Sequence, residues 1–124
     1  MKDRFMEKEI QPQMLKLAQQ ARLLFEKEKL YTDPLMNRKK LANLLRTNEK
    51  YLADAIRLCE GLTVNDFINI FRIKHARRLL EENQQLTALS IAIESGISTR
   101  ITLFRLFRRY YNMSPSAFKK QIEK

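Results

Sequence analysis

Several residue types are scarce in this chain, and each scarcity excludes a class of protein. Among its 124 residues there are one cysteine, one histidine and no tryptophan. A single cysteine, Cys59, excludes an internal disulfide and is interpreted as a buried structural thiol in a reducing compartment. The sequence has no glycine-rich phosphate loop and no cluster with metal-ligand spacing. We therefore expect no enzyme, no catalytic residue, no metal and no cofactor.

Glycine and proline are also rare, at two and three residues. Few turns therefore demand a positive φ, and this favours a helical fold. No apolar stretch approaches the roughly 18–20 residues needed to span a bilayer, so we expect no membrane contact by this segment. The length fits one domain with enough chain for a hydrophobic core.

Basic residues are abundant by contrast. Lysine and arginine number 24 against 14 acidic residues, which gives a formal net charge of +10 and a pI near 10.0. Such a balance indicates a polyanionic partner or surface. Charge alone leaves ribosomal contacts, membrane surfaces and plain solubility open.

The spacing of apolar residues predicts an all-α fold of seven helices with no strand. The helices are expected at about 12–29, 38–45, 49–59, 64–82, 88–95, 99–111 and 115–122. Residues 1–12 are interpreted as a linker or a frayed helix, and residues 13–124 as the domain. The expected N-caps are Asn37, Asn48, Thr87, Ser98 and Ser114, the last followed by Pro115 at the first helical position.

Two segments of the chain, 38–59 and 88–111, repeat one pattern. Each has a short apolar helix, a tight polar turn and a second helix with a leucine followed by a large apolar residue. This is the sequence pattern of a helix-turn-helix. The copies align with an offset of 50 residues in the first helix and 51 in the second, so the second turn is one residue longer. A pair of generic helical hairpins is the alternative interpretation.

The inward residues of each copy determine which face is left for a partner. They are expected to be Leu41, Leu44, Leu45, Leu52, Ala55 and Ile56 in the first copy, and Leu103, Leu106 and Phe107 in the second. Between Ser98 and Tyr110 there are four arginines and no acid, a local charge of +4. Arginine presents a planar fork suited to guanine and to phosphate. A merely solvated face is the alternative, but it seldom carries four arginines without a compensating glutamate.

The second helix of the first copy is nearly balanced in charge. Arg46, Lys50 and Arg57 oppose Glu49 and Asp54, a sum of +1. Asp54 does not suit a phosphate, although it is able to accept from cytosine N4 or to orient Lys50 or Arg57. We therefore expect this helix to position the domain more than to read sequence.

Several motifs together resemble the DNA-binding domain of AraC/XylS-type transcription regulators. They are Leu89-Ser90-Ile91-Ala92 through Gly96, Phe107-Arg108-Arg109, Met113-Ser114-Pro115-Ser116-Ala117-Phe118, and Arg72 with Ala76-Arg77-Arg78-Leu79-Leu80. The resemblance covers about residues 30–120. Three positions depart from the family pattern: Ile97 stands for phenylalanine, Asn112 for glycine and Arg46 for glycine.

The resemblance implies two helix-turn-helix subdomains, about 38–59 and 88–111, joined by a long connecting helix at about 64–82. It further implies a cytoplasmic, sequence-specific transcription regulator, more often an activator, that binds double-stranded DNA and contacts RNA polymerase. The Leu30-Tyr31-Thr32-Asp33-Pro34 segment is similar to the output end of larger sensor proteins, so we expect a sensing or dimerisation domain outside this chain. The alternative function is a basic helical module that binds an acidic protein.

The DNA-binding candidates fall into one group per copy. Carried over by position, the base-reading candidates are Lys50, Ala53 and Asp54, then Arg100, Ile101, Thr102 and Arg105. The full set is Asn48, Lys50, Tyr51, Ala53, Asp54, Arg57, Ser98, Thr99, Arg100, Ile101, Thr102, Arg105, Arg108 and Arg109.

Overall fold

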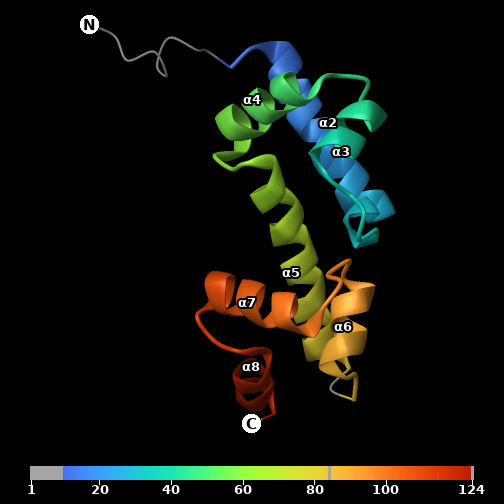
Figure 1. Ribbon diagram of the computed structural model, residues 1–124. Helices are drawn as coiled ribbons and strands as arrows, with labels where there is room; N and C mark the ends of the chain where they lie inside the picture. Colours follow the sequence, from blue (N-terminus) through green and yellow to red (C-terminus); the bar gives the residue numbers. More distant parts are fainter. Residues whose placement is uncertain (1–9, 84, 124) are drawn as a thin grey trace, which may run out of the picture. The chain divides into compact units, whose positions relative to one another are not determined.

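The computed structural model describes residues 10–83 and 85–123 of the chain. Within them lie seven α-helices and one short 3-10 helix, and no strand. Figure 1 shows them in order along the chain. They are α2 (Pro12–Glu28), η1 (Leu30–Thr32), α3 (Arg38–Leu44), α4 (Glu49–Glu60), α5 (Val64–Glu82), α6 (Ala88–Glu94), α7 (Arg100–Tyr111) and α8 (Pro115–Ile122). The predicted all-α fold is confirmed, and the helix ends differ from the expected ones by at most one residue.

Side-chain caps start most of the helices where the sequence predicts. Asn37, Asn48, Thr87 and Ser114 each accept a hydrogen bond from the backbone N–H three residues on. Such a cap satisfies one of the N–H groups that a helix leaves without a partner. The prediction for α7 is wrong by one residue, because Thr99 rather than Ser98 caps it and accepts from the N–H of Thr102 at 3.1 Å.

The chain divides into two compact units. The first comprises residues 10–28 and 37–67 of the described chain. In it α2 and α3 both pack on α4. Its core includes the stacked rings of Phe25 and Phe67, whose centroids lie 5.5 Å apart. Arg22 of α2 donates to Glu60 at the end of α4 and so joins the two helices at the edge of that core.

The second unit comprises residues 29–36, 68–83 and 85–123 of the described chain. Its core joins α5, α6, α7 and α8 through Ile73, Ala76, Leu80, Ile91, Ala92, Ile97, Leu103, Leu106, Phe107 and Phe118. The Phe107 ring lies 5.5 Å from that of Phe118. The guanidinium of Arg77 lies over both Tyr111 and Phe118, 5.0 and 5.1 Å from the ring centroids. These contacts hold α7 and α8 against α5.

The segment 29–36 lies in the second unit although helices of the first unit flank it in sequence. Arg72 of α5 donates to the backbone carbonyls of Tyr31 at 2.8 Å and Asp33 at 2.9 Å. The Tyr31 hydroxyl and His75 Nδ1 form a hydrogen bond of 2.8 Å. Burial lowers the pKa of His75, and Arg78 lowers it further, so the neutral ring is favoured.

The two helix-turn-helix turns have the same left-handed backbone at different residue types. Arg46 has a φ of +57° and Gly96 a φ of +84°. A Cβ on Gly96 would collide with the Tyr31 carbonyl oxygen and lie 2.8 Å from Thr32 Cα. The second turn therefore needs glycine for space as well as for φ. The first turn is four residues long and the second five, so the predicted difference of one residue is confirmed.

Two predictions about burial are wrong. Leu44 is 54% exposed, because the buried face of the short α3 is centred on Leu41 and Ala42 and Leu44 is rotated away from it. Cys59 is only partly buried. Even so, burial raises the pKa of its thiol, and Glu60 adds to this effect.

Candidate nucleic-acid interface

Helix α4 of the first unit presents one polar face to solvent. Its opposite face carries the fully buried Leu52, Ala55 and Ile56. Lys50 and Arg57 are therefore exposed, and because they are seven residues apart they lie on the same face of the helix. The other candidates of this helix, Tyr51, Ala53 and Asp54, are partly exposed, and Asn48 is the exposed N-cap.

Helix α7 of the second unit has the same construction with more charge. Leu103, Leu106 and Phe107 are buried, as predicted. The exposed residues of this turn and helix include Ser98, Thr99, Arg100, Ile101, Arg105, Arg108 and Arg109, with Thr102 partly exposed. The guanidinium of Arg109 lies 5.5 Å from the ring centroid of Tyr110. The predicted set thus gathers on α7 and its N-terminal turn, and contact with DNA stays a prediction.

Two apolar side chains interrupt the arginines of α7. Ile101 is 80% exposed and Phe104 is 40% exposed. A solvent-exposed isoleucine in the first turn of the helix is suited to contact with a thymine methyl group. Phe104 was absent from the predicted set, because an apolar residue directly after the buried Leu103 is not identified as exposed by the spacing of apolar residues.

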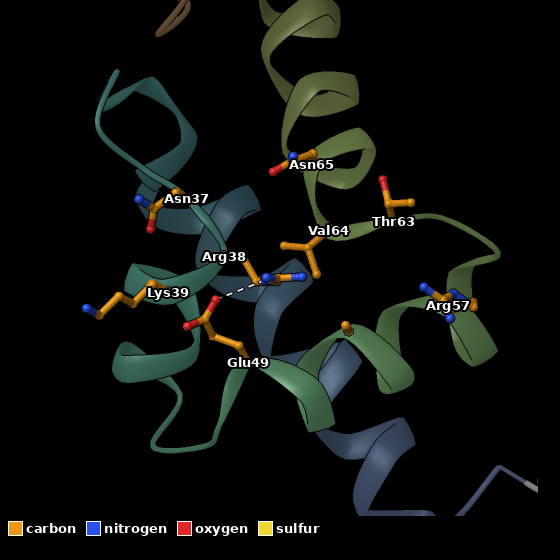
Figure 2. Close-up of a pocket in the computed structure, with 9 residues that line it drawn as sticks. Asn37, Arg38, Lys39, Glu49, Arg57, Thr63, Val64 and Asn65 are labelled. Atoms are coloured by element: carbon orange, nitrogen blue, oxygen red, sulfur yellow. Dashed lines mark hydrogen bonds and ion pairs between the residues drawn. The ribbon is translucent and has the colours of Figure 1, made fainter.

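A cleft of about 370 Å³ lies beside α4 in the first unit. Three elements line it, namely the N-terminal end of α3, one side of α4 and the N-terminal end of α5. The lining residues are Asn37, Arg38, Lys39, Glu49, Ala53, Arg57, Thr63, Val64 and Asn65. In Figure 2 Arg38 and Glu49 meet inside it through an ion pair of 3.0 Å. The predicted set contains Ala53 and Arg57 but none of the lining residues from α3 and α5.

The described residues form neither a metal site nor a membrane-spanning helix. No group of three or more His, Cys, Asp and Glu side chains there has the arrangement of a metal site. No described helix is long and apolar enough to cross a membrane.

Comparison with known proteins places this geometry in a family. Residues 41–121 match the family model described as "Helix-turn-helix domain". The chain is 30% identical over 83 residues to the Msm operon regulatory protein of Streptococcus mutans, an alignment covering 67% of this chain and 30% of that protein. It is 28% identical over 80 residues to the melibiose operon regulatory protein of Escherichia coli, covering 64% and 26%. The chain thus spans less than a third of either relative.

Solved structures share the fold. The C-terminal domain of AraT, a response regulator from Geobacillus stearothermophilus, has a TM-score of 0.78 at 19% identity, covering 92% of this chain and 88% of that one. The C-terminal domain of the two-component response regulator yesN from Fusobacterium nucleatum has a TM-score of 0.75 at 21% identity, covering 84% and 98%.

Proposed function

The chain belongs to the AraC/XylS-type helix-turn-helix family of DNA-binding transcription regulators, and from that premise we propose that it places α4 and α7 in successive major-groove segments of duplex DNA. A recognition helix reads base edges through its solvent-facing side chains, and its buried face fixes the angle at which it enters the groove. Both helices have one buried face and one exposed face, which is polar in α4 and in α7 combines arginines with Ile101 and Phe104.

The observation that carries the proposal is the arginine surface of α7. Arg100, Arg105 and Arg108 are exposed on a helix whose other face is buried by Leu103 and Phe107. Within residues 98–110 no acidic side chain offsets them. Arginine recognises guanine O6 and N7 or a phosphate through two parallel hydrogen bonds. We assign base reading to Arg100 and Arg105, and apolar contact with thymine to Ile101.

The role proposed for α4 is mainly positional. Lys50 faces solvent, whereas the adjacent Asp54 is partly buried and carries the opposite charge. A carboxylate in the groove repels phosphate and accepts only from groups such as cytosine N4. Helix α4, with one cation and one carboxylate at these positions, therefore adds a narrow base preference, and α7 contributes most of the sequence specificity.

The wider role follows from the relatives. Both curated relatives are named as operon regulatory proteins and are more than three times the length of the matched part. We propose that this chain is the cytoplasmic DNA-binding part of a longer regulator, which has a sensing or dimerisation domain elsewhere. The whole regulator would activate transcription by contacting RNA polymerase. The similar C-terminal domains of response regulators support that arrangement.

The test is the salt dependence of binding to labelled random duplex DNA, measured by fluorescence anisotropy. Neutralising some 5–9 phosphates predicts a slope of log affinity against log salt of roughly −4 to −8. Labelled polyglutamate serves as the control polyanion. A flat response with DNA, or binding to polyglutamate as tight as to DNA at each salt concentration, would favour the acidic-protein alternative and contradict the proposal.

A further inference from the structure

We propose that the cleft beside α4 binds a phosphate group, and that in the DNA complex this is a backbone phosphate at the edge of the groove that α4 enters. The inference rests on the proposed function and deepens it. It adds Lys39, Thr63 and Asn65 to the interface and gives Arg57 the role of a phosphate contact.

The first argument is charge. The cleft has three cationic side chains and one carboxylate. Arg38 donates to Glu49 at 3.0 Å, so these two charges offset each other. Lys39 and Arg57 are both exposed and leave the cleft with a net positive charge. Figure 2 shows Lys39 at one edge, with its side chain extending away from Glu49, and Arg57 at the other edge, near Thr63. Two cations at opposite edges of a concave site favour an anion between them.

The second argument is the supply of neutral donors. The cleft includes the start of α5, a helix of 19 residues. The Thr63 hydroxyl oxygen accepts from the N–H of Asp66 at 3.1 Å, and the Thr63 carbonyl accepts from the N–H of Phe67 at 2.9 Å. Val64 and Asn65 are the first two residues of the helix, where backbone N–H groups have no intrahelical acceptor. Together with the two cations, these groups match the preferences of a phosphate oxygen.

The third argument is the register of α4. Glu49, Ala53 and Arg57 line the cleft and follow one another at intervals of four residues, so they form one side of the helix. Lys50 lies seven residues before Arg57 and therefore beside it on the helix surface, and Asp54 lies further round on the same side. A groove entered by the Lys50 face would thus bring one DNA strand over the cleft. The small side chain of Ala53 leaves room for that strand.

The decisive variant is Asn65→Asp, which hardly changes side-chain size. A carboxylate in the first turn of α5 is favourable for the helix but repels phosphate. We expect the urea midpoint of this variant to be unchanged or raised. Its affinity for random duplex DNA at low salt should be lower by on the order of tenfold, and its salt slope should be shallower by about 1. Lys39→Ala should also make the slope shallower by about 0.9.

The matched control is Gln19→Glu, which makes the same charge change on the exposed surface of α2. It measures the effect of net charge alone and should weaken binding much less than Asn65→Asp. If Asn65→Asp and Lys39→Ala bind DNA no worse than the control while the wild-type protein keeps a steep salt slope, the cleft proposal is wrong and the proposed function stands. A flat wild-type slope instead contradicts the proposed function.

A second arm identifies the source of the phosphate. Inorganic phosphate is titrated into the DNA complex at constant ionic strength, with sulfate-free chloride buffer as the reference. If phosphate displaces DNA no better than chloride does, a free phosphorylated ligand is excluded, and the DNA backbone is the source of the phosphate that Asn65→Asp and Lys39→Ala detect. Displacement at submillimolar phosphate that is lost in Asn65→Asp supports the same site with a free phosphorylated molecule as its ligand.

Discussion

Replacing Gly96 by alanine should destabilise the second unit through two separate effects. The φ of +84° is left-handed, and this conformation costs a residue with a Cβ about 1–2 kcal/mol. The added Cβ would also collide with the Tyr31 carbonyl. Moving that carbonyl weakens its 2.8 Å hydrogen bond to Arg72, and a hydrogen bond to a charged group contributes about 1.5–3 kcal/mol. The expected loss in the free energy of unfolding is about 2.5–5 kcal/mol.

Gly61 provides the matched control because it shares only the first effect. Its φ is +72°, but a Cβ there meets no atom within 4 Å. Gly61→Ala should therefore lose only about 1–2 kcal/mol. Urea denaturation followed by circular dichroism measures both variants. Equal losses would refute the inference that contact between the second turn and the 29–36 segment adds to stability.

The other predictions concern reading, packing and pH. Arg105→Ala should lower affinity for a cognate site by about 1–3 kcal/mol and relax specificity there, and equal weakening on random DNA would make Arg105 a phosphate contact instead. Leu103→Asp should unfold the second unit, because it places an unpaired charge at a fully buried position; wild-type helicity by circular dichroism would disprove that. The pKa of His75 is lowered in the folded state by burial and by Arg78, so the unfolded state binds a proton more tightly. The free energy of unfolding should therefore fall as pH drops through about 6.5. Urea midpoints measured between pH 8 and 5 should depend less on pH in His75→Gln than in the wild-type protein. An unchanged pH dependence would exclude His75 as its source.

Features set by neighbouring residues were predictable from the sequence. Asn48 caps α4 and Ser114 caps α8 because both cap bonds span only three residues. The choice between Ser98 and Thr99 as the cap of α7 was not predictable in this way. Both are good caps. Which of them becomes the cap depends on the residue at which the helix begins, and the packing of Leu103 in the core determines that residue.

Features that depend on distant residues were missed. Nothing near Gly96 shows that the carbonyl of Tyr31 approaches it, since the two are 65 positions apart in the sequence. Leu44 was misassigned because a helix of seven residues is too short for its apolar spacing to define one face. The cleft combines residues from Asn37 to Asn65 in three elements, and only the packing of α3, α4 and α5 brings them together.

The most direct test of DNA reading by two helices is a base-substitution scan of a duplex selected from a random pool. Each base pair is changed in turn, and affinity is measured at fixed salt. Two helices in successive major-groove segments predict two patches of sensitive base pairs centred about 10 base pairs apart, with Arg105→Ala removing sensitivity in one patch only. A single sensitive patch, or uniform sensitivity along the duplex, would contradict it.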